Sequence, residues 1–337
     1  MLSAVIFGGT GFIGTYFAQH LVDNQNYQRV YLYDNEGISV KSSVHRKDLI
    51  LQYPQITIIE GDVTNKIEWH PEEEISLVAN FAAVHREPGH EAKEYFYCNI
   101  LGAENICSWS EKIGCEKIIF SSSIAPYGPS EIEMDEKSLP VPVSAYGSSK
   151  LVAEKIHELW FAKNIQNRQL VIVRPGVVFG PGEGGNVSRL IKAVKKRYFF
   201  YTGNKNTRKA GVYVKELCNA MTWVLDLDKN KNKTVIFNMS MNPGPSIEDY
   251  VNTIIKVLNY KTFIPSIHEK FILIASYIID GICKPLKISH PFSPVRIKKL
   301  NKSNNILPSY LIDNKYEYKY SLEEAFLDWK EECPEEW

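Results

Sequence analysis

LSAVIFGGTGFIG, at residues 2–14, gives the clearest indication of how this chain folds. Its first half reads as a short buried strand, and a helical pattern follows it to Val22. Glycines at 8, 11 and 14 allow a tight turn, close approach of the backbone to a pyrophosphate, and helix-on-strand packing. The start of the helix would offer free amides and the positive end of its dipole to phosphates. The stretch therefore predicts a dinucleotide-binding turn made of Gly8, Gly11, Phe12, Ile13 and Gly14.

A second strand, residues 29–34, ends in a carboxylate about twenty residues after this turn. Asp34, with Asn35 beside it, suits the hydroxyl groups of an adenosine ribose. The carboxylate would repel a 2′-phosphate, and no arginine follows it immediately. The sequence therefore favours NAD over NADP as the cofactor.

Strand-like and helical segments alternate through the first half of the chain. The alternation predicts an α/β fold of the Rossmann type, a doubly wound parallel sheet with helices on both faces. After Arg174 this alternation of strands and helices stops. The later segments are mainly helical, with one predicted strand near 234–237 and a polar surface loop at 226–233. The predicted strands lie near 2–7, 29–34, 56–60, 76–82, 116–121 and 168–174, with helices near 90–112 and 146–163.

Composition narrows the class of protein. The 337 residues exceed the size at which one core stops growing, which predicts a large domain with a smaller lobe. Balanced charges, 39 basic against 39 acidic, give no reason to expect a nucleic-acid partner. Six cysteines without paired spacing argue against a metal site and a disulfide framework. With no apolar run of the ~20 residues that a spanning helix needs, and a first strand that leaves no room for a signal peptide, we expect a cytoplasmic enzyme.

Three residues downstream of the turn carry the chemistry. Tyr146 and Lys150 are four residues apart, which puts both side chains on one helix face. A phenol titrates near pKa ~10, and a nearby ammonium is expected to lower that pKa toward neutrality. Ser123 follows the strand 116–121, where its hydroxyl could hold a substrate oxygen while Tyr146 moves the proton. An isolated Tyr-x-x-x-Lys pattern arises easily by chance, so the catalytic interpretation depends on the glycine-rich turn that precedes it in the chain.

The turn, the acid and the Ser/Tyr/Lys set together resemble the extended short-chain dehydrogenase/reductase superfamily, especially its nucleotide-sugar epimerase and dehydratase branch. The resemblance runs from residue 2 to about residue 220, and VRPGVVFGPG at 173–182 matches one of its signatures closely. It implies that Tyr146 and Lys150 also contact the cofactor and that further cofactor contacts come from Asp62, Val63, Phe81, Ala82, Ala83, Asn99 and Pro175.

The resemblance also implies a division of the chain and a set of substrate contacts. Residues 1–175 would form the NAD-binding domain, to which 205–240 partly return, and 176–337 would form most of the substrate lobe. Lys209 stands where the family has a phosphate-binding arginine, and a lysine lacks the bidentate fork of an arginine. The candidate substrate contacts are His85, Ser123, Asn186, Arg208, Lys209 and Arg296. For the three cations the alternative is a solvated surface side chain, and for His85 it is a loop histidine with a structural hydrogen bond.

The expected reaction is 4-epimerisation of a diphosphate-linked hexose or N-acetylhexosamine through a transient 4-keto intermediate. Ile124 and Ala125 follow Ser123 where a dehydratase of this branch has an Asp-Glu pair, so dehydration is disfavoured. An NAD(P)H-dependent 4-ketoreductase would use the same three residues, and a steroid dehydrogenase-like oxidoreductase is a weaker alternative. A non-catalytic binding module would have lost Tyr146 or Lys150.

One apolar segment leaves two interpretations open. GNV at 185–187, Lys209 and VRIKK at 295–299 also resemble a bacterial subgroup that acts on N-acetylated sugars for surface polysaccharides, some of them polyprenyl-linked. FILIASYII at 271–279 would then suit contact with lipid, which allows a peripheral membrane contact. A buried lobe helix is the interpretation favoured for so short a run. We expect the enzyme to be a homodimer.

Overall fold

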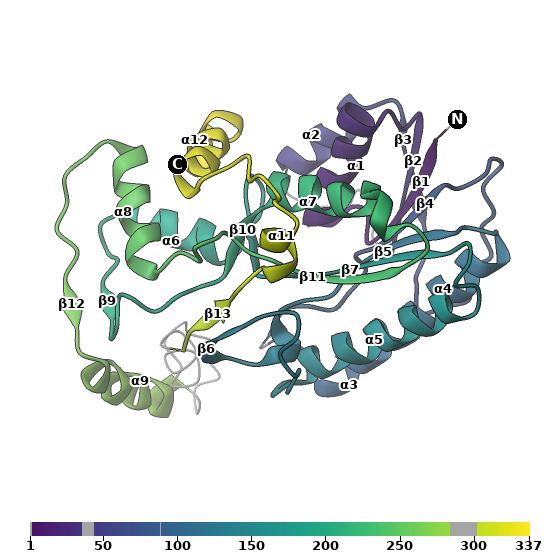
Figure 1. The fold of residues 1–337 in the computed structure, drawn as a ribbon. Coiled ribbons are helices and arrows are strands. Elements are labelled where there is room, and N and C mark those ends of the chain that lie inside the picture. The colour runs from purple at the N-terminus through teal and green to yellow at the C-terminus, as the bar shows by residue number, and fades with distance from the viewer. Residues whose placement is uncertain (1, 36–43, 88, 284–301) are drawn as a thin grey trace.

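A seven-stranded parallel sheet forms the centre of the molecule (Figure 1). The computed structural model describes residues 2–35, 44–87, 89–283 and 302–337. The predicted α/β fold is confirmed, and the predicted strands match the observed ones to within a few residues. Across the sheet the strands are β3 (Ile56–Glu60), β2 (Arg29–Asp34), β1 (Ser3–Phe7), β4 (Leu77–Asn80), β5 (Lys117–Ser121), β7 (Gln169–Pro175) and β11 (Thr234–Met239).

The strand order reverses between β1 and β4. From β1 the chain moves outward to β2 and β3, then returns to pair β4 with the other side of β1. In doubly wound sheets ligands bind at the carboxyl ends of the strands beside such a reversal, because the connecting helices diverge there to opposite faces. The turn after β1 and the residues after β4 therefore line the expected ligand site.

Helices cover both faces of the sheet, which is why every residue of β1, β4 and β7 is buried. Figure 1 shows one group above the sheet and the other below it. The upper helices are α1 (Phe12–Gln25), α2 (Val44–Gln52) and α7 (Val214–Asp226), and the lower ones are α3 (Ala92–Phe96), α4 (Gly102–Lys112) and α5 (Ala145–Ala162).

The single helix predicted near 90–112 is not continuous. A π-helical turn, η1 (Tyr97–Leu101), separates α3 from α4. At its centre the Asn99 side chain accepts a hydrogen bond from the Val84 amide at 2.8 Å and donates to the Val84 carbonyl at 3.1 Å. It also donates to the Ser149 hydroxyl at 2.9 Å. Single π-turns of this kind are common near functional sites. The turn anchors the segment after β4 to α5, which the periodicity of the sequence does not reveal.

The segment 205–240 supplies α7 and the last strand of the sheet, β11. The polar segment expected as a surface loop at 226–233 contains a short helical turn with Asn230 buried. Beyond the sheet lie small paired strands, β8 (Val177–Phe179) with β10 (Gly211–Tyr213), β9 (Tyr201–Thr202) with β12 (Ser266–Ile267), and β6 (Ser130–Met134) with β13 (Asn304–Ile306). Within the described residues the remaining helices are η2 (Ala125–Tyr127), α6 (Asn186–Lys195), η3 (Asp228–Asn230), α8 (Ile247–Leu258), α9 (Glu269–Cys283), α11 (Ser309–Asp313), α12 (Leu322–Glu332) and η4 (Pro334–Glu336).

The C-terminal helix α12 returns to the cofactor-binding half of the molecule. Its Phe326 and Trp329 are fully buried in the core cluster that also contains Tyr16 of α1. The Tyr16 hydroxyl donates to Glu332 at 2.7 Å, and His45 and Lys215 contact the same carboxylate at 2.7 and 2.6 Å. Burial alone would raise the pKa of Glu332, but these partners lower it to about 2. Helix α12 is therefore held against α1, α2 and α7.

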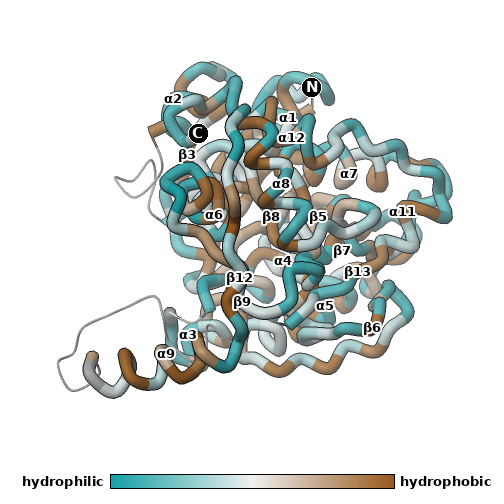
Figure 2. Tube along the Cα trace, turned by 90° about the vertical axis from the view of Figure 1, so that its left-hand side faces the viewer, coloured by the Kyte–Doolittle hydropathy of each residue, from teal (hydrophilic) through white to brown (hydrophobic). Residues whose placement is uncertain are grey.

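The interpretation of 271–279 as a buried helix is wrong. The segment lies in α9, which projects from the body of the molecule (Figure 2) and keeps Phe271, Ile274, Tyr277 and Ile278 open to solvent. Ile272 and Ser276 on the opposite side are buried. A run of apolar residues alone cannot distinguish a helix packed all round from one packed on a single side. No helix in the described part of the chain has the length and hydropathy needed to cross a membrane.

Candidate active site

The glycine-rich turn lies against the residues that follow β4. Gly8 has φ +71°, and a Cβ there would stand 2.7 Å from the backbone nitrogen of Ala82. A side chain at this position would push the two segments apart, so glycine is required by both conformation and space. Phe81 continues β4, and its N–H donates to the carbonyl of Phe7 at 2.9 Å. The turn and the end of β4 thus form one surface at the sheet reversal.

The first turn of α1 is open toward this surface. Gly11 is the N-cap and has no side chain with which to cap the amides of Phe12 and Ile13. An uncapped helix start presents N–H donors and a positive dipole end, which suits the pyrophosphate of a dinucleotide. The residues present therefore fit NAD, since the helix start is uncapped and Gly8 lets the turn lie directly against the residues after β4.

Asp34 lies at the end of β2, beside the same turn. Its carboxylate accepts from the amide of Thr10 at 3.1 Å and from that of Asn35 at 2.9 Å. Arg46, on α2, donates to the carbonyl of Thr10 at 3.3 Å, and burial lowers its pKa. Sequence reasoning missed this arginine, because α2 brings it back from twelve positions beyond Asp34.

Asp34→Ala is expected to weaken NAD binding about tenfold and to improve NADP binding, because the carboxylate no longer repels a 2′-phosphate while the guanidinium of Arg46 stays nearby. Isothermal titration with each dinucleotide, for wild type and variant, measures this. In the matched double variant Asp34→Ala/Arg46→Ala the gain in NADP binding should disappear. Tighter binding of NADP than of NAD by the wild type would refute the role of Asp34.

Ser123 and Tyr146 are in contact at the carboxyl end of β5. A hydrogen bond joins their side chains, and the Ser123 hydroxyl also accepts from the amide of Ala125 at 3.1 Å. Tyr146 is in the first turn of α5, which Ser144 caps by accepting from the amide of Gly147 at 3.2 Å. A Cβ on Gly147 would stand 2.6 Å from the carbonyl oxygen of Ala125. Glycine at 147 therefore lets α5 approach the serine segment closely.

Lys150 follows one turn later on α5 and is buried. Its ammonium lies over the ring of Phe120, 4.6 Å from the ring centroid. Burial lowers the pKa of Lys150 to about 8, while the carboxylate of Glu154 acts in the opposite direction. The structure thus brings together the three predicted catalytic residues, with Ser123 just after β5 and Tyr146 and Lys150 on α5.

The expectation that the pKa of Tyr146 is lowered is wrong for this arrangement. Desolvation raises that pKa to about 12, although the hydrogen bond with Ser123 opposes the rise. Glu87 and Tyr95 contribute further to the increase. The ammonium of Lys150 lies over the Phe120 ring, and desolvation dominates at Tyr146, so the protein groups around the phenol favour its neutral form.

A buried ion pair stands behind the three residues. Glu154, fully buried one turn after Lys150, accepts two hydrogen bonds from Arg174 at 2.9 and 2.7 Å and one from Ser122 at 2.5 Å. Arg174 also donates to the hydroxyl of Tyr127 at 2.7 Å. Sequence reasoning did not identify this pair. The sequence does indicate one half of the pair, because Glu154 stands four residues after Lys150 and so lies on the same face of the predicted helix.

The polar side chains of two residues expected to contact the cofactor, Asn99 and Asp62, are hydrogen-bonded within the protein. The Asn99 amide is fully used by Val84 and Ser149, so it shapes the segment after β4. Asp62 accepts from the amide and the hydroxyl of Thr64, both at 2.8 Å. Val63, Phe81, Ala82, Ala83 and Pro175 contribute backbone and apolar surface at the carboxyl ends of the strands.

The predicted substrate contacts are scattered. His85 follows β4, and its pKa is lowered by desolvation and by the cations Arg86 and Lys150. Asn186 begins α6 and accepts from Arg189, while Arg208 donates to the carbonyl of Gly244 and Lys209 to that of Lys302. None of these contacts joins the last three residues to Ser123 or Tyr146. Arg296 lies outside the described residues.

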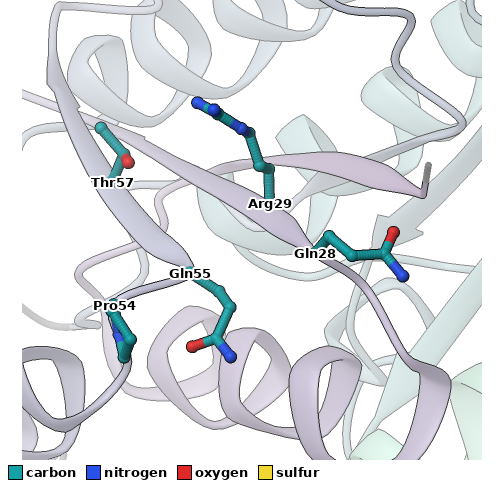
Figure 3. Close-up of a pocket in the computed structure, with 5 residues that line it drawn as sticks. All are labelled: Gln28, Arg29, Pro54, Gln55 and Thr57. Carbon is teal, nitrogen blue, oxygen red and sulfur yellow. The ribbon is translucent and has the colours of Figure 1, made fainter.

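The hollow shown in Figure 3 lies at the opposite edge of the sheet. It has a volume of about 350 Å³, and its lining includes Gln28, just before β2, Arg29, the first residue of β2, and Thr57 of β3. These are the amino ends of the strands, whereas the glycine-rich turn and the Ser/Tyr/Lys set lie at the carboxyl ends. The hollow is therefore separate from the candidate active site.

The sheet reversal, its uncapped helix and the serine–tyrosine contact define a dinucleotide-dependent enzyme with a doubly wound sheet. The chain belongs to the NAD-dependent epimerase/dehydratase family, whose model matches residues 4–240. NAD is accordingly its cofactor, as the sequence predicted.

Known proteins extend the likeness beyond the family model. The chain is 29% identical over 305 residues to an Escherichia coli O157:H7 N-acetyl-α-D-glucosaminyl-diphospho-ditrans,octacis-undecaprenol 4-epimerase, covering 88% of this chain and 85% of that one. It is 24% identical to the UDP-glucose 4-epimerase of Bacillus subtilis, covering 76% and 82%. The crystal structure of the Bacillus cereus UDP-glucuronic acid 4-epimerase in complex with NAD superposes with a TM-score of 0.76 at 20% identity, covering 99% of both chains, which confirms the fold.

Proposed function

We propose that this protein catalyses the NAD-dependent 4-epimerisation of a sugar carried on a diphosphate, through a transient 4-keto sugar. The observation that carries the proposal is the contact between Ser123 and Tyr146, with Lys150 one helical turn away, at the sheet edge that also holds the glycine-rich turn. The relatives described above, which are 4-epimerases by name, support the same reaction.

The chain's own residues divide the work of proton transfer. Tyr146 takes the proton of the sugar hydroxyl and later returns it, which is general acid–base catalysis. Ser123, already hydrogen-bonded to Tyr146, donates to the oxygen of the forming ketone. When bound, NAD supplies the hydride acceptor and a positive charge that favours the phenolate of Tyr146. Lys150 is one helical turn after Tyr146 on α5, so its ammonium would bind a ribose hydroxyl of the cofactor beside the tyrosine.

The residues that hold NAD in this proposal follow from the surface at the sheet reversal. Amides of Gly11, Phe12 and Ile13 would meet the pyrophosphate, and Asp34 would bind the adenosine ribose. Asp62 and Val63 lie on the β3 side, where they would border the adenine. The backbone of Phe81, Ala82 and Ala83 would lie along the cofactor beside Gly8.

For the substrate we propose an N-acetylhexosamine or hexose, with UDP or a polyprenyl chain beyond the diphosphate. The E. coli relative acts on a polyprenyl-linked N-acetylglucosamine, and the B. subtilis relative on UDP-glucose. Arg208 and Lys209 offer charge for the diphosphate once their carbonyl partners are exchanged, and Asn186, His85 and Arg296 are retained as candidate contacts.

Incubation of the purified protein with UDP-N-acetylglucosamine, UDP-glucose and a polyprenyl-diphosphate N-acetylglucosamine, without added cofactor, tests the proposal. We expect interconversion of at least one pair of 4-epimers, followed by NMR or by chromatography of the released sugar, together with NAD retained on the protein. Stoichiometric consumption of NAD(P)H with a 4-keto sugar, and no interconversion of any stable sugar, would show a ketoreductase instead.

We also propose that the enzyme is a cytoplasmic homodimer. Val152 and Leu159 of α5 are exposed on one helix face, as is Tyr97 of η1, which together offer an apolar surface for a second copy. All six cysteines are free thiols, which suits a reducing compartment. Sedimentation velocity measures the association, and a mass of one 38.5 kDa chain at micromolar concentration would contradict it.

A further inference from the structure

The exposed side of α9 is an apolar surface on a helix that is otherwise attached to the lobe. Phe271, Ile274 and Ile278 follow a three- and four-residue spacing, and Tyr277 lies beside them. Ile274 and Ile278 are 58% and 59% exposed, whereas Ile272 behind them is 7% exposed. The helix is therefore apolar on the side turned to solvent, where a helix of a water-soluble lobe would carry polar residues.

The inner side of α9 borders a second apolar region. A hollow of about 330 Å³ lies between the helix and the paired strands β9 and β12, lined almost wholly by apolar groups from Phe200, Ile267, Ile272, Ala275 and Ile279. Ile267 is partly exposed, and Phe263, in the loop before β12, is open to solvent. The apolar surface of α9 thus continues onto the body of the lobe.

A second exposed apolar segment lies on the same side of the molecule. In both views α9 and β6 are at the lower side, while α2 is at the top (Figures 1 and 2). Ile132 of β6 is exposed, and so are Leu139, Val141 and Val143 in the segment that leads from β6 to α5 and Tyr146. A flat apolar partner on this side would meet both α9 and the segment that leads to the candidate active site.

The charge of the neighbouring sequence indicates what that partner is. Between residues 284 and 302, directly after α9 in the chain, the sequence has six basic residues and no acidic one, namely Lys284, Lys287, Arg296, Lys298, Lys299 and Lys302. A helix that exposes Phe, Tyr and Ile, next to a basic stretch in the sequence, is typical of segments that lie in the interface of a bilayer with anionic lipids.

We infer that α9 is a membrane-docking helix, which lies in the plane of the bilayer surface and buries Phe271, Ile274, Tyr277 and Ile278 among the lipid chains. The inference rests on the proposed function in one respect, because a polyprenyl-linked sugar resides in a membrane and the enzyme must come to it. Docking of the lower side would bring the segment before Tyr146 toward the surface where the diphosphate head group of such a substrate lies.

Flotation of the full-length protein with vesicles tests the inference. We expect the wild type to float with vesicles of phosphatidylethanolamine and phosphatidylglycerol, less with phosphatidylcholine alone, and less at high salt, because anionic lipid attracts the basic residues. The variant Ile274→Glu/Ile278→Glu should lose binding about tenfold or more, since two charges replace apolar side chains at the interface. The matched control Leu51→Glu, on α2 at the top of the molecule and 72% exposed, should float as the wild type does.

Two further measurements keep the outcome clear. Bound NAD and the melting temperature should be unchanged in the double variant, because both isoleucines are exposed. Sedimentation without lipid shows whether a second copy of the chain covers α9; if the substitutions dissociate a dimer, or if the wild type does not float, the inference is overturned. Flotation needs no turnover, so a protein that floats without epimerising sugars refutes the proposed function alone, and one that epimerises without floating refutes the docking alone.

Discussion

Tyr146→Phe is expected to lower the turnover number by roughly 10²–10⁴-fold while NAD binding stays close to that of the wild type. The substitution removes the hydroxyl that contacts Ser123 but leaves the ring, whose centroid lies 6.1 Å from that of Tyr95. No other described side chain is hydrogen-bonded to Ser123 in a way that would replace the proton donor and acceptor. Initial rates of epimerisation and titration of NAD measure the two quantities.

Tyr95→Phe is the matched control for this substitution. Tyr95 is next to Tyr146, but it is buried and its hydroxyl donates to the carbonyl of Arg86 instead of facing Ser123. Its loss should change the rate far less. Lys150→Met is expected to weaken both turnover and NAD binding, because in the proposed mechanism the Lys150 ammonium binds the cofactor ribose one helical turn from Tyr146. Near-wild-type turnover of Tyr146→Phe would mean that another group is the base.

Glu154→Leu is expected to destabilise the protein by about 3–5 kcal/mol, because it leaves the guanidinium of Arg174 buried without its carboxylate. Unfolding in urea, followed by fluorescence with NAD held constant, measures the change. The double variant Glu154→Leu/Arg174→Met removes both charges and should recover a large part of the loss. Equal destabilisation of the single and the double variant would show that the packing of the site, and not the unpaired charge, carries the effect.

The same ion pair connects stability to the candidate active site. Glu154 opposes the lowering of the Lys150 pKa, so its removal should lower that pKa below about 8. A larger fraction of Lys150 would then be neutral at a given pH, and the alkaline limb of the pH–rate profile should move to lower pH. Ser122, directly after β5, and Tyr127, of η2, hydrogen-bond to the pair, which explains why Ser122 is buried while Ser123 faces Tyr146.

Local patterns in the sequence were enough to predict the doubly wound sheet, the glycine-rich turn, Asp34 and the Ser123/Tyr146/Lys150 set. These features depend on local rules, namely strand-to-helix turns, one-turn spacing on a helix and alternation of strands with helices, and each can be recognised within a short window of residues. The reaction class followed through the family resemblance carried by the same windows.

Features that join residues far apart in the chain could be seen only in the folded protein. The fold places Arg46 beside the glycine-rich turn and pairs Glu154 with Arg174. It also brings Asn99 into hydrogen bonds with the segment after β4. The direction of the Tyr146 pKa is of the same kind, because burial by distant segments outweighs the spacing to Lys150. The apolar run in α9 has the composition of a core helix, and only packing on a single side left Ile274 and Ile278 facing solvent, since hydropathy does not specify which side a neighbour covers.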